Sequence, residues 1–331
     1  MDFNTKFLDP PGELVRFIET GSRFIITGHK DPDGDCVGSQ LALRSALIRL
    51  GKEAVVCSVG PFDRTEIKSY TDHFIKFSEA QTKDARVIII DCTGRDRTGD
   101  IQELIEGFPC AIVDHHAVVT HPPSTEQAPV YVDSNAPACT LLIHKLIIAL
   151  GLEITKEEAD FLFFGLCTDT GFFRFLNETN AAVFDNAATL VRCGANPKKT
   201  FNMINGSKSL NSRLLIGNIL SRTESHFEGR LLLTYETLEE YKKYGFEHRD
   251  SDSLYQLLLS VDGVEASVII RQECVDSCTV SLRSVDKINV AKIAAAFAGG
   301  GHKNAAGMTV KGDISYVKQT VLKSFHDSFI H

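Results

Sequence analysis

The 331-residue sequence predicts an α/β protein, with a doubly wound parallel sheet followed by a smaller α+β domain. Three observations support this prediction. The chain is about twice the common domain length or more. Its first half alternates short β-branched runs with amphipathic stretches, which is typical of strands buried on both faces of a parallel sheet. After residue 228, several strand-like runs come before the next helical pattern, which favours an α+β arrangement.

Four strands form the predicted sheet of the first domain. They are expected at residues 24–27, 54–57, 87–90 and 111–113. Amphipathic patterns predict helices at residues 39–50, 100–106, 138–150 and 156–166. The last of these helices follows Thr155, with Glu158 three residues further on, and this spacing is typical of a capping box.

The pattern changes after Asn180, where we expect the first domain to end. Residues 181–193 predict a helix that stops at Gly194, and Pro197 begins a further helical stretch. We therefore predict a catalytic domain over residues 1–190, a helical connector over residues 191–228 and a second domain over residues 229–331. The second domain is expected to hold strands at 231–235, 266–271, 279–283 and 308–311, and helices at 290–298 and 314–329.

Composition excludes several classes of protein. Lys and Arg number 35 against 43 Asp and Glu, a formal net charge of −8, whereas binding of long duplex nucleic acid needs a dense cationic surface. No apolar run approaches the ~20 residues of a membrane helix, so no membrane partner is expected. Nine cysteines, an odd number scattered among apolar segments, indicate reduced thiols in the core and a cytoplasmic location.

Acidic residues and histidines follow three of the predicted strands. Residues 29–35 (HKDPDGD) follow the first strand, Asp91 follows the third, and residues 114–116 (DHH) follow the fourth. Because the carboxyl ends of parallel strands share one edge of a sheet, we expect these groups to meet in one crevice. Asp169 ends another apolar stretch and could join them. Turn chemistry also favours Asp and Gly in loops, but it does not explain their joint occurrence at three strand ends.

Carboxylates gathered in this way repel one another unless a multivalent cation neutralises them. A mixture of imidazole and carboxylate ligands suits manganese, iron or zinc, whereas magnesium prefers oxygen and retained water. With one Asp bridging, the set can hold two ions ~3.5 to 4 Å apart, an arrangement that clamps the attacking and leaving oxygens of a phosphoryl centre. The sequence therefore predicts hydrolysis of a phosphoester or a phosphoanhydride.

A glycine run in the second domain is a candidate phosphate site. Residues 299–301 are three glycines after a predicted helix, and their N–H groups can cradle a phosphate. Such a run by itself is more often a helix stop. His302 and Lys303 adjoin it, however, and Arg283 ends a nearby predicted strand, which favours binding of a terminal phosphate.

These motifs resemble those of a known family. Residues 29–35, Asp91, residues 114–116 and Asp169 resemble the four motifs of the DHH phosphoesterase superfamily. Residues 281–284 and 299–307 are similar to those of its DHHA1 substrate domain. Length and architecture are most similar to the nanoRNase group, oligoribonucleases that also remove the 3′-phosphate of adenosine 3′,5′-bisphosphate (pAp).

The resemblance implies a role for each matching residue. One ion would be held by His29 and Asp33, the other by Asp35, His115 and Asp169, with Asp91 bridging. Asp114 would orient a neighbouring imidazole, and His116 would face the substrate. The residues implied to bind substrate are Arg174, Arg283, Gly300, Gly301, His302 and Lys303. The implied cofactor is a pair of Mn²⁺ ions, with Mg²⁺ or another divalent metal as the alternative.

Two departures from the family pattern affect substrate contacts. Residues 135–140 (NAPACT) stand where relatives often carry consecutive hydroxyl residues, and Phe172-Phe173 separate Gly171 from Arg174. The implied reaction is hydrolysis of short oligoribonucleotides to 5′-mononucleotides and of pAp, and the enzyme would be a monomer or a homodimer. The alternatives are a cyclic di-AMP or pApA phosphodiesterase and, in a different class, a non-hydrolytic nucleotide sensor.

Overall fold

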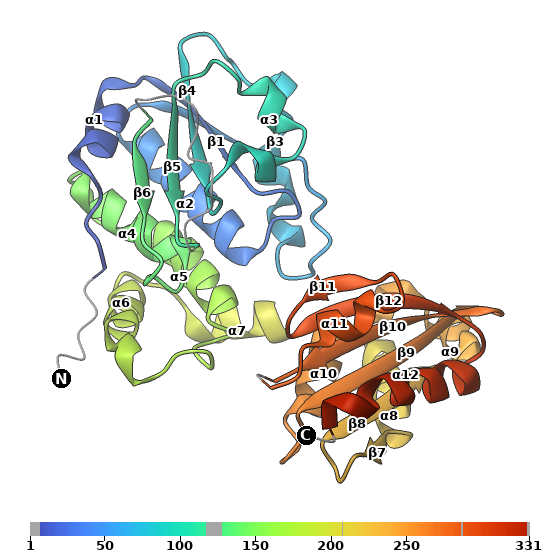
Figure 1. Ribbon diagram of the computed structural model, residues 1–331. Coiled ribbons are helices and arrows are strands. Elements are labelled where there is room, and N and C mark those ends of the chain that lie inside the picture. The colour runs from blue at the N-terminus through green and yellow to red at the C-terminus, as the bar shows by residue number, and fades with distance from the viewer. Residues whose placement is uncertain (1–6, 117–127, 207, 286, 330–331) are drawn as a thin grey trace. The chain divides into compact units, whose positions relative to one another are not determined.

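The computed structural model describes residues 7–116, 128–206, 208–285 and 287–329 (Figure 1). The chain divides into two compact units, with the division between residues 207 and 208. The segment 191–228, for which we predict a separate connector, is shared between them. Helix α7 (Pro197–Asn205) packs against α5 in the first unit, whereas α8 (Leu210–Ser221) contributes to a core of the second unit. Met203 and Ile204 of α7 pack, partly buried, against the core of the first unit, whereas Leu215, Ile216 and Ile219 of α8 are buried in a core of the second.

The first unit contains a sheet of six parallel strands in the order β3-β2-β1-β4-β5-β6. This topology confirms the predicted doubly wound α/β fold, but the sheet has two strands more than the four predicted. The additional strands, β3 and β6, lie at the two edges and are only two and three residues long. The strands are β1 (Arg23–Gly28), β2 (Glu53–Cys57), β3 (Phe74–Ile75), β4 (Ala85–Ile90), β5 (Cys110–Asp114) and β6 (Val130–Val132). Along β1, Phe24 and Ile26 face one core and Ile25 faces the other, which explains why this strand is apolar without interruption.

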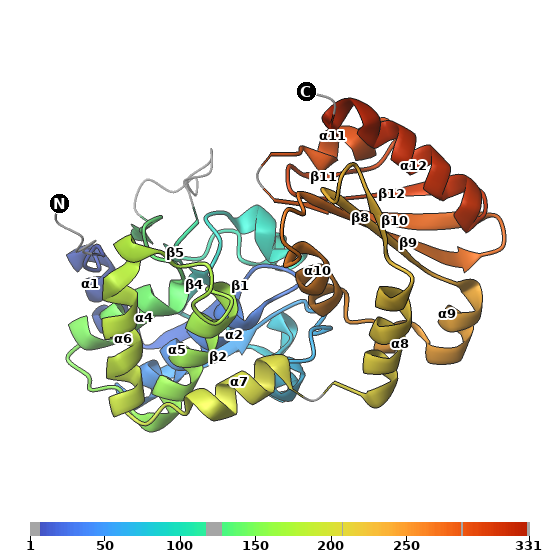
Figure 2. The same cartoon turned by 90° about the horizontal axis from the view of Figure 1, so that it is seen from below.

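The helices of the first unit cover both faces of the sheet (Figure 2). They are α1 (Gly12–Thr20), α2 (Gly34–Arg49), α3 (Ile101–Leu104), α4 (Cys139–Ala149), α5 (Lys156–Asp169), α6 (Ala181–Arg192) and α7. Short 3₁₀ helices lie at Lys68–His73, Phe77–Glu79, Arg95–Thr98 and Glu178–Asn180. The predicted capping box of Thr155 and Glu158 is present. Helix α2 begins five residues before the predicted start, because Asp33 caps it.

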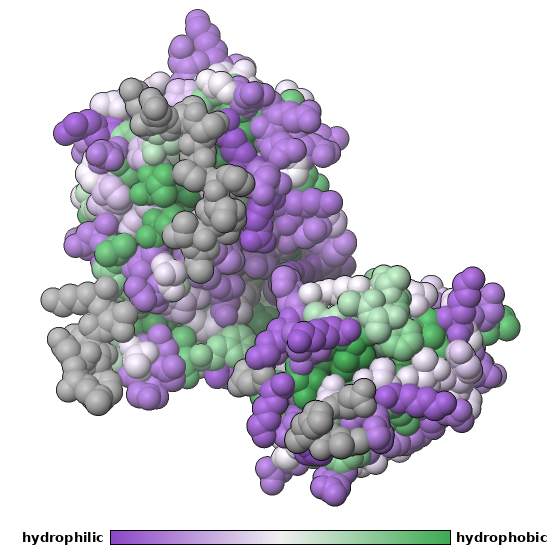
Figure 3. All heavy atoms as spheres, in the orientation of Figure 1, coloured by the Kyte–Doolittle hydropathy of each residue, from purple (hydrophilic) through white to green (hydrophobic). Residues whose placement is uncertain are grey.

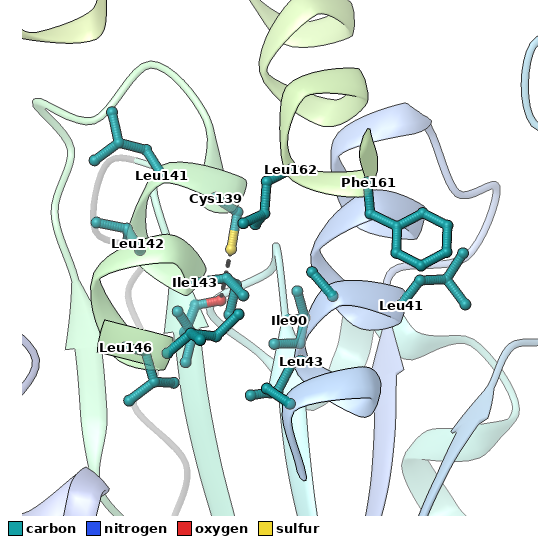
Figure 4. Packing of buried hydrophobic residues seen from close by; sticks show 14 of the residues in the cluster. Leu41, Leu43, Ile90, Cys139, Leu141, Leu142, Ile143, Leu146, Phe161 and Leu162 are labelled. Atoms are coloured by element: carbon teal, nitrogen blue, oxygen red, sulfur yellow. Dashed lines mark hydrogen bonds between the residues drawn. The ribbon is translucent and has the colours of Figure 1, made fainter. Parts of the chain in front are cut away.

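Helices α2, α4 and α5 form one layer over β1, β4 and β5. Figure 4 shows how Leu43 on α2, Ile143 on α4 and Leu162 on α5 converge on Ile90 at the end of β4. In the same cluster, the Cys139 thiol donates to the Val113 carbonyl oxygen at 3.4 Å. This dense packing holds the ends of three helices against the ends of the strands, and this edge of the sheet carries the predicted site.

The second unit contains a mixed sheet in the order β11-β12-β10-β9-β8-β7, with only β8 and β9 parallel. Its strands are β7 (Glu224–His226), β8 (Leu231–Glu236), β9 (Ala266–Cys274), β10 (Ser277–Ser284), β11 (Gly300–His302) and β12 (Ala305–Lys311). Its helices are α8, α9 (Leu238–Tyr244), α10 (Ser251–Leu259), α11 (Val290–Ala295) and α12 (Ile314–Phe329), with a 3₁₀ turn at Phe246–His248. This arrangement confirms the predicted α+β class.

Helices cover the two faces of this second sheet unequally. Helices α11 and α12 pack on one face, and α8, α9 and α10 lie on the other (Figure 2). Residues Thr279, Ser281 and Arg283 of β10 are all partly exposed on the second face. Part of that face therefore remains open to a ligand.

Among the described residues, no helix is long and apolar enough to cross a membrane. Around α3 the visible surface of the first unit is largely hydrophilic (Figure 3).

Candidate metal centre

The predicted acidic and histidine groups meet at the carboxyl edge of the first sheet. His29 follows β1, Asp91 follows β4, and Asp114 ends β5. Asp91 has a φ of 61°, an unfavourable value for a residue other than glycine. Asp169 lies at the end of α5 rather than at a strand end. Thus a helix C-terminus and three strand ends supply the groups of one centre.

His115 faces three carboxylates. Its Nε2 lies 3.2 Å from Asp169 Oδ2, 3.4 Å from Asp91 Oδ1 and 3.8 Å from Asp35 Oδ2. Its Nδ1 lies 3.1 Å from the Ala136 carbonyl oxygen, which can accept the Nδ1 proton. This contact orients the ring so that Nε2 faces the carboxylates, as in many metal-binding histidines.

His29 repeats this arrangement on the other side of Asp91. Its Nε2 lies 3.5 Å from Asp91 Oδ2 and 3.8 Å from Asp33 Oδ2, and its Nδ1 lies 2.7 Å from the Lys30 carbonyl oxygen. The two oxygens of Asp91 are therefore directed at two different imidazoles. This position is the one that a ligand bridging two ions needs.

The helix N-termini hold Asp33 and Asp35 in place. Asp33 caps α2, and its Oδ1 accepts hydrogen bonds from the N–H groups of Asp35 and Cys36 at 3.1 and 3.0 Å. Asp35 is fully buried and accepts hydrogen bonds from the N–H groups of Cys139 and Thr140 at 2.5 and 2.9 Å. Each carboxylate thus gains from the positive end of a helix.

Asp114 positions the following two residues. Its Oδ1 accepts hydrogen bonds from the N–H groups of His115 and His116 at 2.7 and 3.1 Å and lies 2.7 Å from His116 Nδ1. The imidazole that Asp114 orients is therefore that of His116. Asp114 is fully buried, whereas the His116 side chain is 41% exposed. His116 can therefore meet a substrate.

The pKa values reflect the crowding of like charges. Burial, reinforced by Asp91 and Asp169, raises the pKa of Asp35 well above its usual range. Burial raises the pKa of Asp169 to about 6, although His115 opposes the shift. Burial alone would lower the pKa of His115, but the surrounding carboxylates raise it to about 10. A divalent cation would remove this conflict by stabilising the ionised carboxylates.

The donor atoms are close enough to hold metal ions. Their groupings are Asp35 with His115 and Asp169; Asp91 with Asp114, His115 and His116; and His29 with Cys36 and Asp91. Asp91 Oδ1 is buried and has no hydrogen-bond partner among the described residues. The mixed nitrogen and oxygen donors fit Mn²⁺ and related ions. Sequence reasoning assigned Cys36 to the core, and the structure buries it fully, with its sulfur also close to ring and carboxylate atoms of His29 and Asp91.

The predicted substrate residues of the second unit lie on adjacent strands. Arg283 on β10 and His302 on β11 both pair with Ala305 of β12, so they form one row across three strands. The Arg283 guanidinium lies 4.4 Å from the centre of the Tyr255 ring and donates to the Leu282 carbonyl oxygen. Gly300 and His302 belong to an exposed edge strand.

Two glycines of the run, Gly300 and Gly301, belong to β11, which forms a β-hairpin with β12. Gly301 has a φ of 142°, and a Cβ there would lie 2.4 Å from the Ala305 carbonyl oxygen, so the tight approach of β11 and β12 requires glycine. Lys303 lies in the turn, where its carbonyl oxygen accepts a hydrogen bond from Val290 N–H at 2.8 Å. A pocket of about 580 Å³ lies beside this hairpin. Its lining residues are Thr279, Val280, Ser281, Phe297, Ala298, Gly299, Gly307, Met308 and Thr309.

Arg174 lies on an exposed turn five residues after Asp169. Its guanidinium lies 4.7 Å from the centre of the Phe175 ring. The preceding residues, Gly171, Phe172 and Phe173, all have positive φ values. Contacts with three further aromatic rings, those of Phe163, Phe184 and Phe201, hold this unusual turn. The two extra phenylalanines thus have a structural role.

Comparison with known proteins agrees with this geometry. The family model for the N-terminal domain of the DHH family matches residues 23–166, and the model for the DHHA1 domain matches residues 233–329. The bifunctional oligoribonuclease and PAP phosphatase NrnA of Thermus thermophilus is 34% identical over 319 residues, which cover 95% of this chain and 92% of the relative. The protein of the same name from Bacillus subtilis is 26% identical and is covered to 92%.

Two solved structures share the fold. An exopolyphosphatase-related protein from Bacteroides fragilis has a TM-score of 0.77 and 23% identity; the match covers 96% of this chain and 94% of that one. The exonuclease RecJ bound to manganese has a TM-score of 0.54 and 15% identity, with 98% and 96% covered. The matches over both units, taken with the cluster at the sheet edge, show that this chain belongs to the DHH phosphoesterase family and carries a DHHA1 domain.

Proposed function

We propose that this protein is a metal-dependent phosphoesterase that hydrolyses short oligoribonucleotides to 5′-mononucleotides and removes the 3′-phosphate of pAp. The observation that carries the proposal is the position of Asp91, with one carboxylate oxygen directed at His29 and the other at His115. The names of the NrnA relatives supply the substrate class.

The residues of the first unit divide into two metal positions that share Asp91. We assign His29 and Asp33 to one position and Asp35, His115 and Asp169 to the other. Divalent ions bound there, for which Mn²⁺ is our first choice and Mg²⁺ the alternative, would acidify a water molecule and stabilise charge on the phosphoryl oxygens. The chain supplies the rest of the chemistry.

His116 is the proposed proton donor to the leaving oxygen. Its Nδ1 is 2.7 Å from Asp114, so its Nε2 remains for the substrate. The hydrogen bond to Asp114 also raises the pKa of His116, which favours the protonated form that a general acid requires.

We assign substrate holding to exposed cations outside the metal cluster. Arg174 is the candidate near the metal centre, and Arg283, Gly300, Gly301, His302 and Lys303 form the candidate phosphate site of the second unit.

A substrate panel tests the proposal. The protein, freed of metal and then supplied with Mn²⁺ or Mg²⁺, is incubated with a fluorescent RNA trimer, pAp, pApA and cyclic di-AMP. Release of mononucleotide from the trimer and of phosphate from pAp is expected, and neither should occur without metal. Exclusive turnover of the dinucleotides would favour the phosphodiesterase alternative, and binding of all four without turnover would favour a sensor.

Two wider predictions accompany this function. All nine cysteines are free, which fits the reducing cytoplasm. We also propose a homodimer as the assembly to test against a monomer. Light scattering of the purified protein distinguishes the two.

A further inference from the structure

Cys36 places a sulfur atom at the edge of the metal cluster. It lies in the first turn of α2, one residue after Asp35, and is fully buried. Its sulfur accepts a hydrogen bond from Gln40 Nε2 at 3.3 Å. Burial raises the pKa of the Cys36 thiol to about 11, so a metal ion that binds the sulfur has to displace its proton.

The sulfur has two neighbours that can bind the same ion. Cys36 Sγ, a ring nitrogen of His29 and a carboxylate oxygen of Asp91 all lie within 4.8 Å of one another, and all three residues are buried. Metal–sulfur and metal–nitrogen bonds of about 2.3 and 2.0–2.1 Å allow donors on opposite sides of an ion to be about 4.4 Å apart. Small side-chain shifts would therefore allow the three donor atoms to coordinate one ion.

The carboxylate in this group has no fixed cationic partner. Asp91 is 1% exposed, its Oδ2 lies 3.5 Å from His29 Nε2, and no Lys or Arg among the described residues forms an ion pair with it. A buried carboxylate of this kind attracts a cation independently of Cys36. The site therefore does not rest on the cysteine alone.

We propose that Cys36 is a conditional metal ligand, recruited with His29 and Asp91 by thiophilic divalent ions such as Zn²⁺ or Cd²⁺ and left unused by Mn²⁺ or Mg²⁺. Soft ions select thiolate ligands, whereas hard ions select oxygen. As the metal–sulfur bond forms, the thiol proton leaves to water. The inference rests on the proposed function in one respect, since the soft ion would displace the catalytic ion from His29 and so inhibit hydrolysis.

Two neighbouring cysteines provide matched controls. Cys92 and Cys139 are as deeply buried as Cys36 and lie beside the same acidic groups. Their thiols point at backbone carbonyl oxygens, those of Ile90 and Val113. Neither occurs in a possible metal-ligand group among the described residues.

Cadmium binding to the full chain tests the proposal without any substrate. Metal-free, reduced protein is titrated with Cd²⁺ while the ultraviolet thiolate-to-cadmium charge-transfer absorption is followed, and Mn²⁺ binding is measured in parallel from the electron paramagnetic resonance of free Mn²⁺. The wild type and C92S should show a band that saturates near one equivalent. C36S should lose the band and bind Cd²⁺ about tenfold or more weakly, with Mn²⁺ affinity changed less than about threefold.

Other results would overturn the inference. A band that persists in C36S would assign the thiolate to another cysteine, such as exposed Cys274. An equal loss of affinity for both ions would make Cys36 a structural residue. X-ray absorption of the wild type loaded with one Zn²⁺ needs no variant: one sulfur neighbour supports the proposal, and none refutes it. These readouts do not depend on turnover, so a failure of the proposed hydrolysis would be seen separately in the substrate panel.

Discussion

Two buried acidic clusters, one in each unit, differ in how their charge is balanced. In the second unit, fully buried Glu236 lies 2.9 Å from Arg249 Nε and 3.4 Å from Arg271 Nε. In the first unit, Asp35 and Asp91 are as deeply buried, but no Lys or Arg forms an ion pair with either among the described residues. The arginine guanidinium groups make Glu236 part of a permanent ion-pair network that contributes to the structure of the second unit. Asp35 and Asp91 instead need a bound divalent cation to balance their charge.

The difference predicts opposite responses to the loss of one negative charge. Removing a carboxylate that is paired with buried arginines leaves those cations uncompensated. Removing a carboxylate from a crowded cluster relieves repulsion in the metal-free protein but destroys a metal ligand.

The largest expected effect is that of D91A on turnover. Loss of a ligand shared by two metal positions should lower kcat about a thousandfold or more, beyond the roughly 10- to 100-fold typical of an outer partner of a ligand. Steady-state hydrolysis of the RNA trimer over a range of Mn²⁺ concentrations measures it, with exposed Asp72→Ala as the control. Wild-type turnover at high Mn²⁺ would contradict the shared position of Asp91.

The metal-free D91A protein provides the other half of the test. Loss of Asp91 relieves repulsion of Asp35 and Asp169 but also removes the carboxylate that faces His29 and His115. The two effects oppose each other, so the melting temperature without metal should stay close to that of the metal-free wild type, and added Mn²⁺ should raise it less. A clear drop in melting temperature without metal would mean that Asp91 is a structural carboxylate like Glu236.

E236Q should destabilise the second unit. Arg271 would lose its carboxylate partner and Arg249 would keep only Glu273; both side chains are 8% exposed, and we expect a cost of about 3 kcal/mol. Urea unfolding of the full chain measures the change, and E239Q at an exposed neighbouring position is the control. A stability equal to that of the wild type would break the distinction between the two clusters.

Glu158 tests whether a buried carboxylate stabilises the fold because it has a cationic partner or because it lies in the second unit. Although it lies in the first unit, it has a fixed partner, Arg49 Nη1 at 2.7 Å, and it accepts hydrogen bonds from Ser45 and Thr155. Burial alone would raise the pKa of Glu158, but these contacts lower it. Its contribution to stability is therefore complete above the pKa of the unfolded chain and is lost as the pH falls through the lowered folded value.

We accordingly expect E158Q to cost about 1–3 kcal/mol at pH 7. The difference in unfolding free energy between the wild type and E158Q should stay constant down to about pH 5 and become smaller below about pH 4.5. Urea unfolding at several pH values measures both quantities, with exposed Glu157→Gln as the reference. A stability difference that becomes larger at acid pH would contradict a lowered pKa of Glu158 in the folded protein.

The smallest effect is expected at Arg283, a cation without a carboxylate partner among the described residues. Since it lacks the partner that Arg249 has, we expect it to bind a substrate phosphate. R283A should raise KM about 3- to 10-fold with little change in kcat. The KM of R283K should lie between those of the wild type and R283A, because lysine keeps the positive charge but cannot form the two parallel hydrogen bonds of a guanidinium group. K287A, at an exposed lysine paired with Glu265, is the control; an unchanged KM in R283A would remove Arg283 from the site.

Sequence reasoning located β1, β2, β4, β5 and the residues of the acidic cluster because both signals are local, but it missed β3 and β6, whose two and three residues are too short to show a periodic pattern. The run from Val87 to Ile90 predicts a strand buried on both faces, and the polar residue that follows it must lie at the sheet edge. The start of α2 was missed because Gly34 and Asp35 disfavour a helix interior, whereas Asp33 turns them into a capped first turn.

The sequence by itself determined the fold class, the strand ends and the kinds of atom offered to a metal, because periodicity and residue type depend on near neighbours along the chain. Only the tertiary structure decided that Asp91 lies between two imidazoles, that Cys36 joins them, that α7 and α8 belong to different units, and that Arg271 is paired while Arg283 is not. Those outcomes depend on which distant segments pack together, and burial against a particular neighbour sets both the distance and the charge balance.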